Sequence, residues 1–212
     1  MIHRRNAGDG FVTCSCGQAH WGLFGAAGLL LATEDQVLLQ HRAKWSHHGG
    51  TWGIPGGALR PGETPLAGAL REAWEEAGIP AAQVQARFGH ILAHEGWSYT
   101  TVVASANEAV TPAPHDAESI EVRWVPQDEV EHLNLLPEFA ASWPLLRQWL
   151  GRQLWWSRPE PVPDAMSTAD LARYVGLDAT PWAAEVGIWY PTPARGADSA
   201  KLRADRPGDV VI

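Results

Sequence analysis

The stretch GALRPGETPLAGALREAWEEAGI, residues 57–79, decides the fold class because it places one well-marked helix directly behind a tight turn. Thr64 is suited to cap the first turn of a helix, and Pro65 suits the first helical position, where no donor N–H is needed. Gly78 can adopt the left-handed conformation that commonly ends a helix. The pattern therefore predicts a helix over residues 65–77.

Three glutamates share one face of this predicted helix. At about 100° per residue, Glu72, Glu75 and Glu76 fall within one arc. The apolar face consists of Leu66, Ala69, Leu70, Ala73 and Ala77. Each like-charged pair opposes the helix by about 0.2–0.5 kcal/mol unless something compensates it, and Arg71 is the only cation at helical spacing. A solvated acidic face is one interpretation; we favour the other, a site for hard cations such as Mg²⁺ or Mn²⁺.

The turn before the helix suits the same chemistry. Residues 54–63, IPGGALRPGE, are rich in glycine, whose backbone can approach a metal or a pyrophosphate without a Cβ in the way. Divalent cations hold phosphate oxygens, neutralise charge in the transition state and lower the pKa of a bound water. The residues therefore favour hydrolysis of a phosphoanhydride.

The whole stretch resembles the Nudix box, G-x5-E-x7-R-E-U-x-E-E-x-G-U. The matching residues are Gly57, Glu63, Arg71, Glu72, Ala73, Glu75, Glu76, Gly78 and Ile79. Ala73 departs from the pattern, because a bulkier aliphatic residue is usual there. The order of elements over residues 20–150 is also similar to the Nudix α/β/α sandwich, and the upstream GTWGIPGG resembles the MutT-like members.

The resemblance implies a role for each matched residue. Glu72, Glu75 and Glu76 would bind Mg²⁺, or alternatively Mn²⁺, and the Gly57 carbonyl would be a further ligand. Arg71 would orient the glutamates, and Glu63 would support the junction of loop and helix. The family often uses a glutamate before a late strand as ligand or general base, and Glu118 in HDAESIEV is placed for that role. The alternative for Glu118 is a solvated loop acid.

The resemblance leaves the substrate open among nucleoside diphosphates linked to another group. The proline of ADP-ribose pyrophosphatases is missing from LAHEGW, residues 92–97, and the tyrosine of dinucleoside polyphosphate hydrolases is not at its usual spacing. Elimination favours a pyrophosphohydrolase of normal or oxidised nucleoside triphosphates. The alternatives are an ADP-ribose, dinucleoside polyphosphate or nucleotide-sugar hydrolase, or a nucleotide-sensing module of the same fold. Candidates for stacking a base are Trp45, Trp52, Trp97 and Tyr99.

The remaining pattern predicts a mixed α/β sandwich rather than regular βαβ alternation. The predicted strands cover residues 26–32, 37–41, 52–54, 84–96, 97–106 and 120–126, the first two forming a hairpin. A short helix is expected from about Gln127 and a longer one over residues 137–150. We divide the chain into an N-terminal segment (1–20), a Nudix hydrolase domain (21–152) and a C-terminal extension of linker, short helix and tail (153–212).

Composition sets the expected partners and compartment. The 212 residues carry a net charge of -8, which argues against binding to polymeric nucleic acid. No apolar run approaches the length of a membrane span, and the two cysteines are too close in sequence for an easy disulfide, so we expect a cytoplasmic protein. The C-terminal residues 167–186 faintly resemble a helix-turn-helix, although a packing segment or homodimer contact is favoured.

The segment CSCGQAH places Cys14, Cys16 and His20 close together. These residues could form part of a zinc site. A closed structural site needs four ligands, however, so that a residue such as His3 would have to be recruited. Reduced, partly buried thiols are the alternative that we favour.

Overall fold

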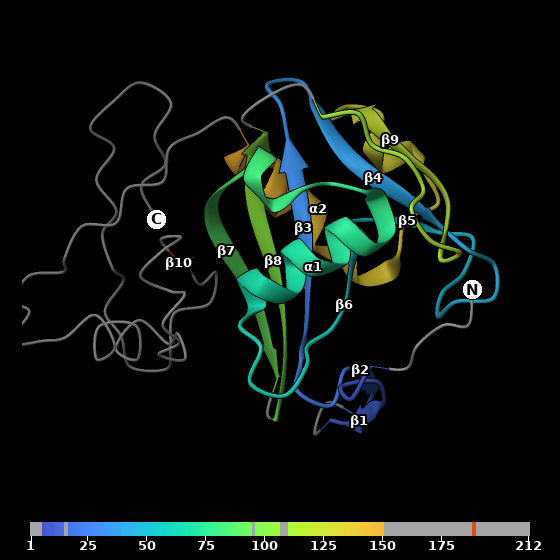
Figure 1. Ribbon diagram of the computed structural model, residues 1–212, viewed down its shortest axis with the longest axis vertical. Helices are drawn as coiled ribbons and strands as arrows, with labels where there is room; N and C mark the ends of the chain where they lie inside the picture. Colours follow the sequence, from blue (N-terminus) through green and yellow to red (C-terminus); the bar gives the residue numbers. More distant parts are fainter. Residues whose placement is uncertain (1–5, 15–16, 95, 107–109, 151–187, 190–212) are drawn as a thin grey trace, which may run out of the picture.

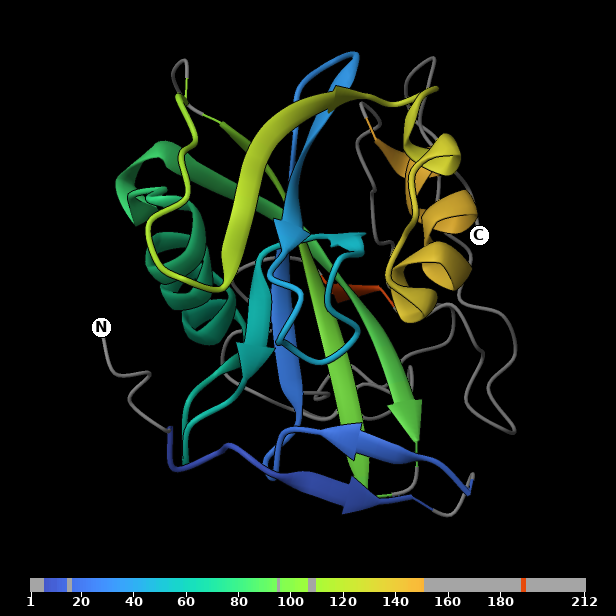
Figure 2. The same cartoon turned by 90° about the vertical axis from the view of Figure 1, so that its right-hand side faces the viewer.

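Strand β3 (Ala26–Ala32) runs through the middle of the protein, and all of its residues are buried. The computed structural model describes residues 6–14, 17–94, 96–106, 110–150 and 188–189. Helix α1 (Pro65–Ala77) covers one face of the sheet around β3, and helix α2 (Pro137–Trp149) covers the other (Figures 1 and 2). This arrangement confirms the predicted α/β/α sandwich.

One half of the sheet is built on the parallel pairing of β3 with β8 (Trp97–Ala106). β7 (Val84–His94) pairs antiparallel with β8, and the two residues of β10 (Ile188–Trp189) pair parallel with β7. Because β3 is covered on both faces, its sequence is a continuous apolar run rather than an alternating one. The rest of the predicted C-terminal extension, including residues 167–186, lies outside the described residues.

The predicted hairpin of β3 and β4 (Gln36–Arg42) exists only near its turn. The two strands pair at Ala32 and Val37 and then separate. β6 (Gly56–Ala58) fills the edge of β3, while β5 (Trp52–Gly53) and β9 (Ser119–Pro126) flank β4. β6 corrects the sequence interpretation, which treated these glycine-rich residues as loop.

Glycines make the close pairing of β6 with β3 sterically feasible. A Cβ on Gly56 would stand 2.6 Å from the Gly28 Cα, and a Cβ on Gly28 would collide with the Tyr99 hydroxyl. Only glycine at both positions lets two backbones and a phenol meet here. The glycine richness that suggested a loop therefore reflects close packing.

Two cores lie on opposite faces of the sheet. Ala69, Ala73 and Ala77 of α1 pack against Leu29 and Leu31 of β3. Phe139, Trp143 and Leu146 of α2 pack against the opposite face, which includes Leu30, Leu39 and Val103. Ala73, the departure from the box pattern, is fully buried, so its small size lets α1 lie close to the sheet.

The ends of the helices follow the sequence signals. Thr64 Oγ1 accepts a hydrogen bond from the Ala67 N–H at 3.2 Å, and Gly78 ends α1 at φ 66°. The short helix expected from Gln127 is the 3-10 turn η2 (Val130–His132), and another 3-10 turn, η1 (Ala81–Gln83), follows α1. The predicted helix over 65–77 is thus confirmed.

An N-terminal hairpin precedes the main sheet and was not predicted as a structural element. Its strands β1 (Phe11–Thr13) and β2 (Ala19–Trp21) pair antiparallel and lie near the start of β8 (Figure 2). Short strands separated by a cysteine-rich turn carry too weak a period to be recognised.

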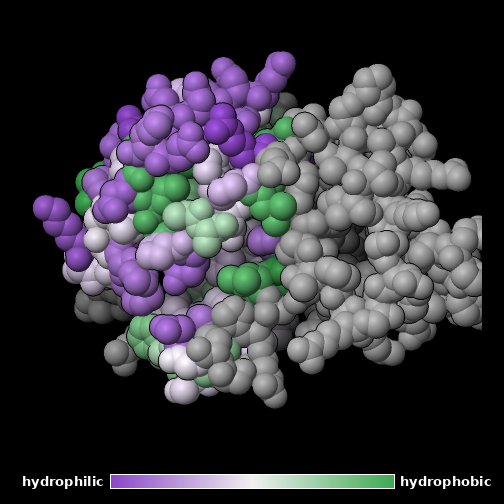
Figure 3. Space-filling model, turned by 180° about the vertical axis from the view of Figure 1, so that it is seen from behind, coloured by the Kyte–Doolittle hydropathy of each residue, from purple (hydrophilic) through white to green (hydrophobic). Residues whose placement is uncertain are grey.

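The surface of the described residues carries separate hydrophobic patches. Viewed from the side opposite to that of Figure 1, these patches lie between polar regions (Figure 3). Phe11, Leu23 and Phe24 are among the exposed large apolar residues, and they lie in or just after the N-terminal hairpin. No helix within the described part of the chain is long and apolar enough to cross a membrane.

Replacing Thr64 with alanine removes the N-cap of α1. We expect the free energy of unfolding to fall by about 1 kcal/mol, because the Ala67 N–H loses its acceptor. Urea denaturation followed by circular dichroism measures the change. Thr64→Ser is the matched control and should stay close to the wild-type stability; equal stability of the alanine and serine variants would contradict the capping role.

Candidate functional site

The guanidinium of Arg71 joins the turn before α1 to the acidic face of the helix. It donates to both carboxylate oxygens of Glu63 at 2.8 Å and to the Ala58 carbonyl at 3.1 Å. It also donates to Glu72 at 2.6 Å and to Glu75 at 3.0 Å. The Arg71 side chain is only 13% exposed. Planar, fully paired guanidinium geometry of this kind fixes the carboxylates around it.

The Glu63 carboxylate completes this junction. Burial opposes its ionisation, but the hydrogen bonds from Arg71 and from the Arg60 backbone hold the pKa of Glu63 below its usual value. Glu63 is therefore ionised at neutral pH. Its predicted role at the junction of loop and helix agrees with these contacts.

Glu72 lies directly against the backbone of Gly57. A Cβ at Gly57 would stand 2.7 Å from Glu72 Oε1, so glycine is needed for this approach. Burial raises the pKa of Glu72 to about 7, although the neighbouring Arg71 charge opposes the shift. The Gly57 carbonyl and the Glu72 carboxylate were both predicted as ligands, and the structure brings the two residues together.

Glu76 is the most deeply buried carboxylate of the cluster, with 2% exposure. Its Oε2 accepts a hydrogen bond from the Gly56 N–H at 2.8 Å. Burial raises the pKa of Glu76 to about 8, and the charge of Glu72 adds to the shift. A buried carboxyl with so few compensating cations is suited to receive one.

Glu75 occupies the outer side of the cluster. Its carboxylate pairs with Arg71 at 3.0 Å and with Arg60 at 3.2 Å, and its side chain is 43% exposed. Arg60 is a second compensating cation that helical spacing did not reveal. In this arrangement no three acidic, histidine or cysteine side chains among the described residues are spaced to hold a metal. The donor set still fits a hard cation, because the largely buried Glu72 and the buried Glu76 supply carboxylate oxygens beside the Gly57 backbone, which lines the cavity.

Glu118 approaches the cluster from the loop before β9. Its charge contributes to the raised pKa of Glu72, after burial and the charge of Glu75. The backbone around it is held, because the Glu118 N–H donates to Asp116 and the Glu118 carbonyl accepts from the Ala43 N–H. The predicted role of Glu118 as ligand or base stays a prediction that this placement supports.

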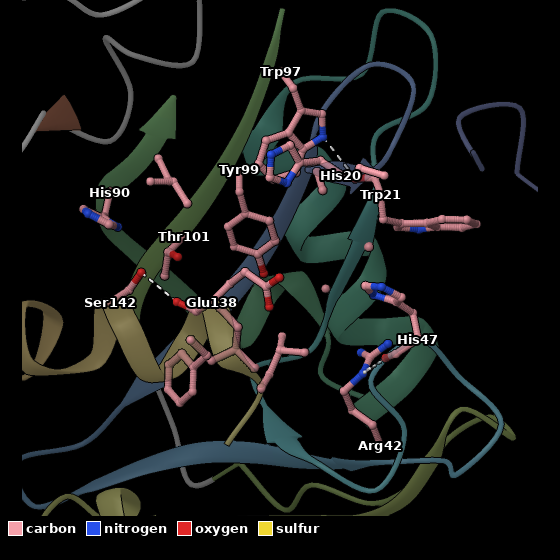
Figure 4. Close-up of a pocket in the computed structure, with 18 residues that line it drawn as sticks. His20, Trp21, Arg42, His47, His90, Trp97, Tyr99, Thr101, Glu138 and Ser142 are labelled. Carbon is pink, nitrogen blue, oxygen red and sulfur yellow. Dashed lines mark hydrogen bonds between the residues drawn. The ribbon is translucent and has the colours of Figure 1, made fainter. Parts of the chain in front are cut away.

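A cavity of about 110 Å³ adjoins the glycines on the side of the sheet that α2 covers (Figure 4). Its lining residues include Gly56, Gly57, His20, Trp97, Tyr99 and Glu138. Two of the four aromatic candidates, Trp97 and Tyr99, therefore lie at the cavity. Trp45 is exposed, and Trp52 is buried with its ring stacked on His41 at 4.8 Å; neither lines the cavity.

The cavity also contains residues that the sequence interpretation did not single out. Arg42 and His47 line one side, and the Arg42 Nε–H donates to the His47 carbonyl at 3.3 Å. Burial raises the pKa values of Glu76 and Tyr99. The charge of Arg42 opposes both shifts. A cation that acts on Glu76 therefore also lines the cavity. No local motif marks Arg42, because it reaches the site from the end of β4.

Helix α2 provides the far wall of the cavity. Glu138 lies in its first turn, and Ser142 Oγ donates to the Glu138 carbonyl at 3.0 Å. His90 of β7 lines the same wall, and burial lowers its pKa to about 4, so it is neutral at physiological pH. The wall therefore presents polar groups inside an otherwise aromatic cavity.

The predicted zinc ligands are only partly described. Cys14 is buried, and His20 lies in β2 with its ring stacked on Trp97. Cys16 and His3 lie outside the described residues. The zinc site consequently stays an untested prediction.

Comparisons with known proteins find related sequences and structures. The NUDIX domain model matches residues 23–149. A protein of Mycobacterium tuberculosis named putative 8-oxo-dGTP diphosphatase 3 is 49% identical over 154 residues, covering 68% of this chain and 70% of that protein. A nucleoside triphosphate pyrophosphatase/Nudix hydrolase fusion protein of Bifidobacterium longum is 47% identical over 146 residues. The match covers 65% of this chain and only 30% of the fusion protein.

A solved structure of similar sequence also exists. The crystal structure of the Nudix hydrolase RenU from M. smegmatis is similar with a TM-score of 0.61 and 47% identity, covering 68% of this chain and 95% of that one. An Ap4A hydrolase of C. elegans, at 23% identity and a TM-score of 0.50, shares the fold. The domain match over residues 23–149 contains the carboxylates of α1 and every residue that lines the cavity except Ala19, His20 and Trp21.

The raised pKa values of Glu72 and Glu76 predict a pH-dependent stability of the metal-free protein. The ordinary pKa of a glutamate, 4.5, rises to about 7 for Glu72 and to about 8 for Glu76. A carboxyl group whose pKa is higher in the folded protein than in the unfolded chain stabilises the fold at pH values below its pKa in the unfolded chain. This contribution is lost as the pH rises through the pKa of the group in the folded protein. We therefore expect these two groups to lower the free energy of unfolding steadily between pH about 4.5 and 8.

Urea denaturation in EDTA at a series of pH values measures this dependence. Glu76→Gln should flatten the decline, while Glu121→Gln, an exposed carboxylate on β9, should leave it unchanged. The same slope in wild type and Glu76→Gln would contradict the assignment.

Proposed function

Because the chain belongs to the NUDIX family, whose domain model matches residues 23–149, we propose that its site hydrolyses a phosphoanhydride bond in a nucleoside diphosphate linked to another group. One observation carries this proposal. The carboxylates of the largely buried Glu72 and the buried Glu76 lie against Gly57 and Gly56, and the same two glycines line an aromatic cavity. Phosphates beside the carboxylates would thus place the rest of a nucleotide in the cavity.

We propose that Glu72 and Glu76, with Glu75 and the Gly57 carbonyl, hold Mg²⁺, with Mn²⁺ as the alternative. When bound, the cation would stabilise negative charge on the phosphates and activate a water. Residues of the chain would position the ligands and transfer protons. Arg71 keeps Glu72 in place, and binding of a cation would displace the proton that Glu76 largely retains at neutral pH. We propose that Glu118, whose charge acts on Glu72, accepts a proton from the attacking water.

The substrate that we favour is an oxidised or normal purine nucleoside triphosphate. The name of the M. tuberculosis relative, at 49% identity over 68% of this chain, supports an 8-oxo-dGTP-like substrate. The cavity adds independent support, because aromatic rings and polar groups line it together. There are two alternatives. The first is hydrolysis of ADP-ribose, dinucleoside polyphosphates or nucleotide sugars. The second is that the protein is a nucleotide-sensing module without hydrolytic activity.

The complete set of box glutamates argues against a pure sensor, because binding alone does not need every carboxylate. The cytoplasmic location, the homodimer and the absence of membrane or nucleic-acid partners stay predictions from the sequence. So does the division into residues 1–20, 21–152 and 153–212.

Incubation with a nucleotide panel tests the proposed activity. The panel contains normal and oxidised nucleoside triphosphates, ADP-ribose, NADH, dinucleoside polyphosphates and nucleotide sugars, each with Mg²⁺ or Mn²⁺. We expect an oxidised or normal purine nucleoside triphosphate to be cleaved to the nucleoside monophosphate and pyrophosphate, detected by chromatography.

Glu76→Gln should lower kcat/KM at least about 100-fold, because an amide is a poor ligand for a hard cation. Glu121→Gln, on the exposed face of β9, is the matched control and should keep wild-type activity. If wild type binds a panel member but cleaves none with either metal, the sensor interpretation replaces the hydrolase.

A further inference from the structure

The N-terminal hairpin forms one wall of the cavity although it precedes the region that the NUDIX domain model matches. The matched region begins at residue 23, whereas Ala19, His20 and Trp21 of β2 line the cavity. The residues of this wall therefore lie outside the domain match.

The hairpin is attached to the main sheet by specific contacts. The His20 ring lies nearly parallel to the Trp97 ring, with centroids 4.2 Å apart and planes 14° apart. The Trp97 Nε1–H donates to the Trp21 carbonyl at 3.1 Å. Phe11 of β1 packs edge-on against Trp21 at 5.0 Å and against His47 at 5.4 Å. The hairpin thus contacts both β8 and the loop on the opposite side of the cavity.

The period of β8 places two aromatic rings and a threonine behind this wall. Trp97, Tyr99 and Thr101 alternate along the strand, so they share one face, and all three line the cavity. Trp97 is only 8% exposed, and His20 stacks on one face of its ring. Figure 4 shows His20 over Trp97 and next to Tyr99. The hairpin therefore adds the His20 ring to the rings of Trp97 and Tyr99.

We propose that His20 is the surface on which the nucleobase of the ligand stacks, and that the N-terminal hairpin thereby helps to select the nucleotide. The inference rests on the proposed function only in taking a nucleotide as the ligand. A base stacked on His20 would continue the Trp97–His20 pair, with its phosphates toward Gly56 and Gly57.

The zinc hypothesis assigns a different role to the same residue. The pairing of Val12 with His20, and the hydrogen bond from the Cys14 N–H to the Gln18 carbonyl, place Cys14 and His20 on the same face of the hairpin. Stacking needs an aromatic ring, whereas zinc binding needs a ring nitrogen. Phenylalanine at position 20 separates the two roles, because it keeps the ring and loses the nitrogen.

Calorimetric titration of the full-length protein with dGMP and with 2-deoxyribose 5-phosphate tests the proposal without requiring turnover. His20→Ala should weaken dGMP binding by about 5- to 100-fold, the usual loss for one base–aromatic stack. Binding of the base-free sugar phosphate should not change. His20→Phe should bind dGMP within a few fold of wild type. His132→Ala, in η2 and away from the cavity, is the control for removal of a histidine.

Each outcome decides the proposal. Unchanged dGMP binding by His20→Ala, or no dGMP binding by wild type at millimolar concentrations, would overturn it. Equal loss in His20→Ala and His20→Phe, together with loss of zinc measured by elemental analysis, would overturn it in favour of a metal role. His20-dependent dGMP binding by a protein that cleaves no nucleotide would uphold it while removing the proposed hydrolase.

For a wild type that turns over a nucleoside triphosphate, steady-state kinetics gives a second readout. His20→Ala should raise KM with kcat nearly unchanged, because stacking on a remote base acts equally on the ground state and the transition state. A matching fall in kcat without a change in KM would contradict the stacking role. Thermal unfolding of each variant shows whether the hairpin remains folded.

Discussion

The hydrogen bonds of one guanidinium hold the carboxylate cluster together. Arg71 donates to Glu63, to Glu72 and Glu75, and to the Ala58 carbonyl, so it joins the turn before α1 to the helix itself. Without this cation the like charges on α1 would repel one another, and the turn would lose the hydrogen bond from Arg71 to the Ala58 carbonyl. Arg71 is itself largely buried, and the hydrogen bonds that it donates to Glu63 raise its pKa, so it stays charged at any working pH. A lysine could not reproduce this planar, multiply paired contact.

The second constraint is the separation of β3 from β4. After pairing at Ala32 and Val37 the strands diverge, and β6 enters beside β3 through contacts that only glycine permits at Gly28 and Gly56. The carboxylates of α1 lie on one side of the sheet, and the cavity lies on the side of α2. The glycines of β6 contact both, because Gly56 donates to Glu76 and also lines the cavity. The opening in the sheet therefore brings acidic and aromatic groups from its two faces to a common point.

Local signals in the sequence were sufficient for α1, its caps and the face that carries the glutamates. They were also sufficient for the long strands, whose apolar runs are continuous or alternating. Local signals could not predict pairing between distant segments. β6 lies in a glycine-rich segment whose composition is typical of a turn, and the strands of the N-terminal hairpin are too short to show a period. The same reason explains the missed site residues. Arg42, His90 and Glu138 come from separate elements, and only the folded sheet brings them to one cavity.

The central claim is that Glu72 and Glu76 form a binding site for a divalent cation beside the Gly56–Gly57 backbone. Calorimetric titration of Mg²⁺ into metal-free protein at pH 8, in two buffers of different ionisation enthalpy, tests it most directly. The account predicts saturable binding by wild type with release of protons, because the pKa values of about 7 and about 8 must fall when the cation enters. It predicts at least about tenfold weaker binding by Glu72→Gln and by Glu76→Gln. Equal affinity in all three proteins, with no proton release, would contradict it.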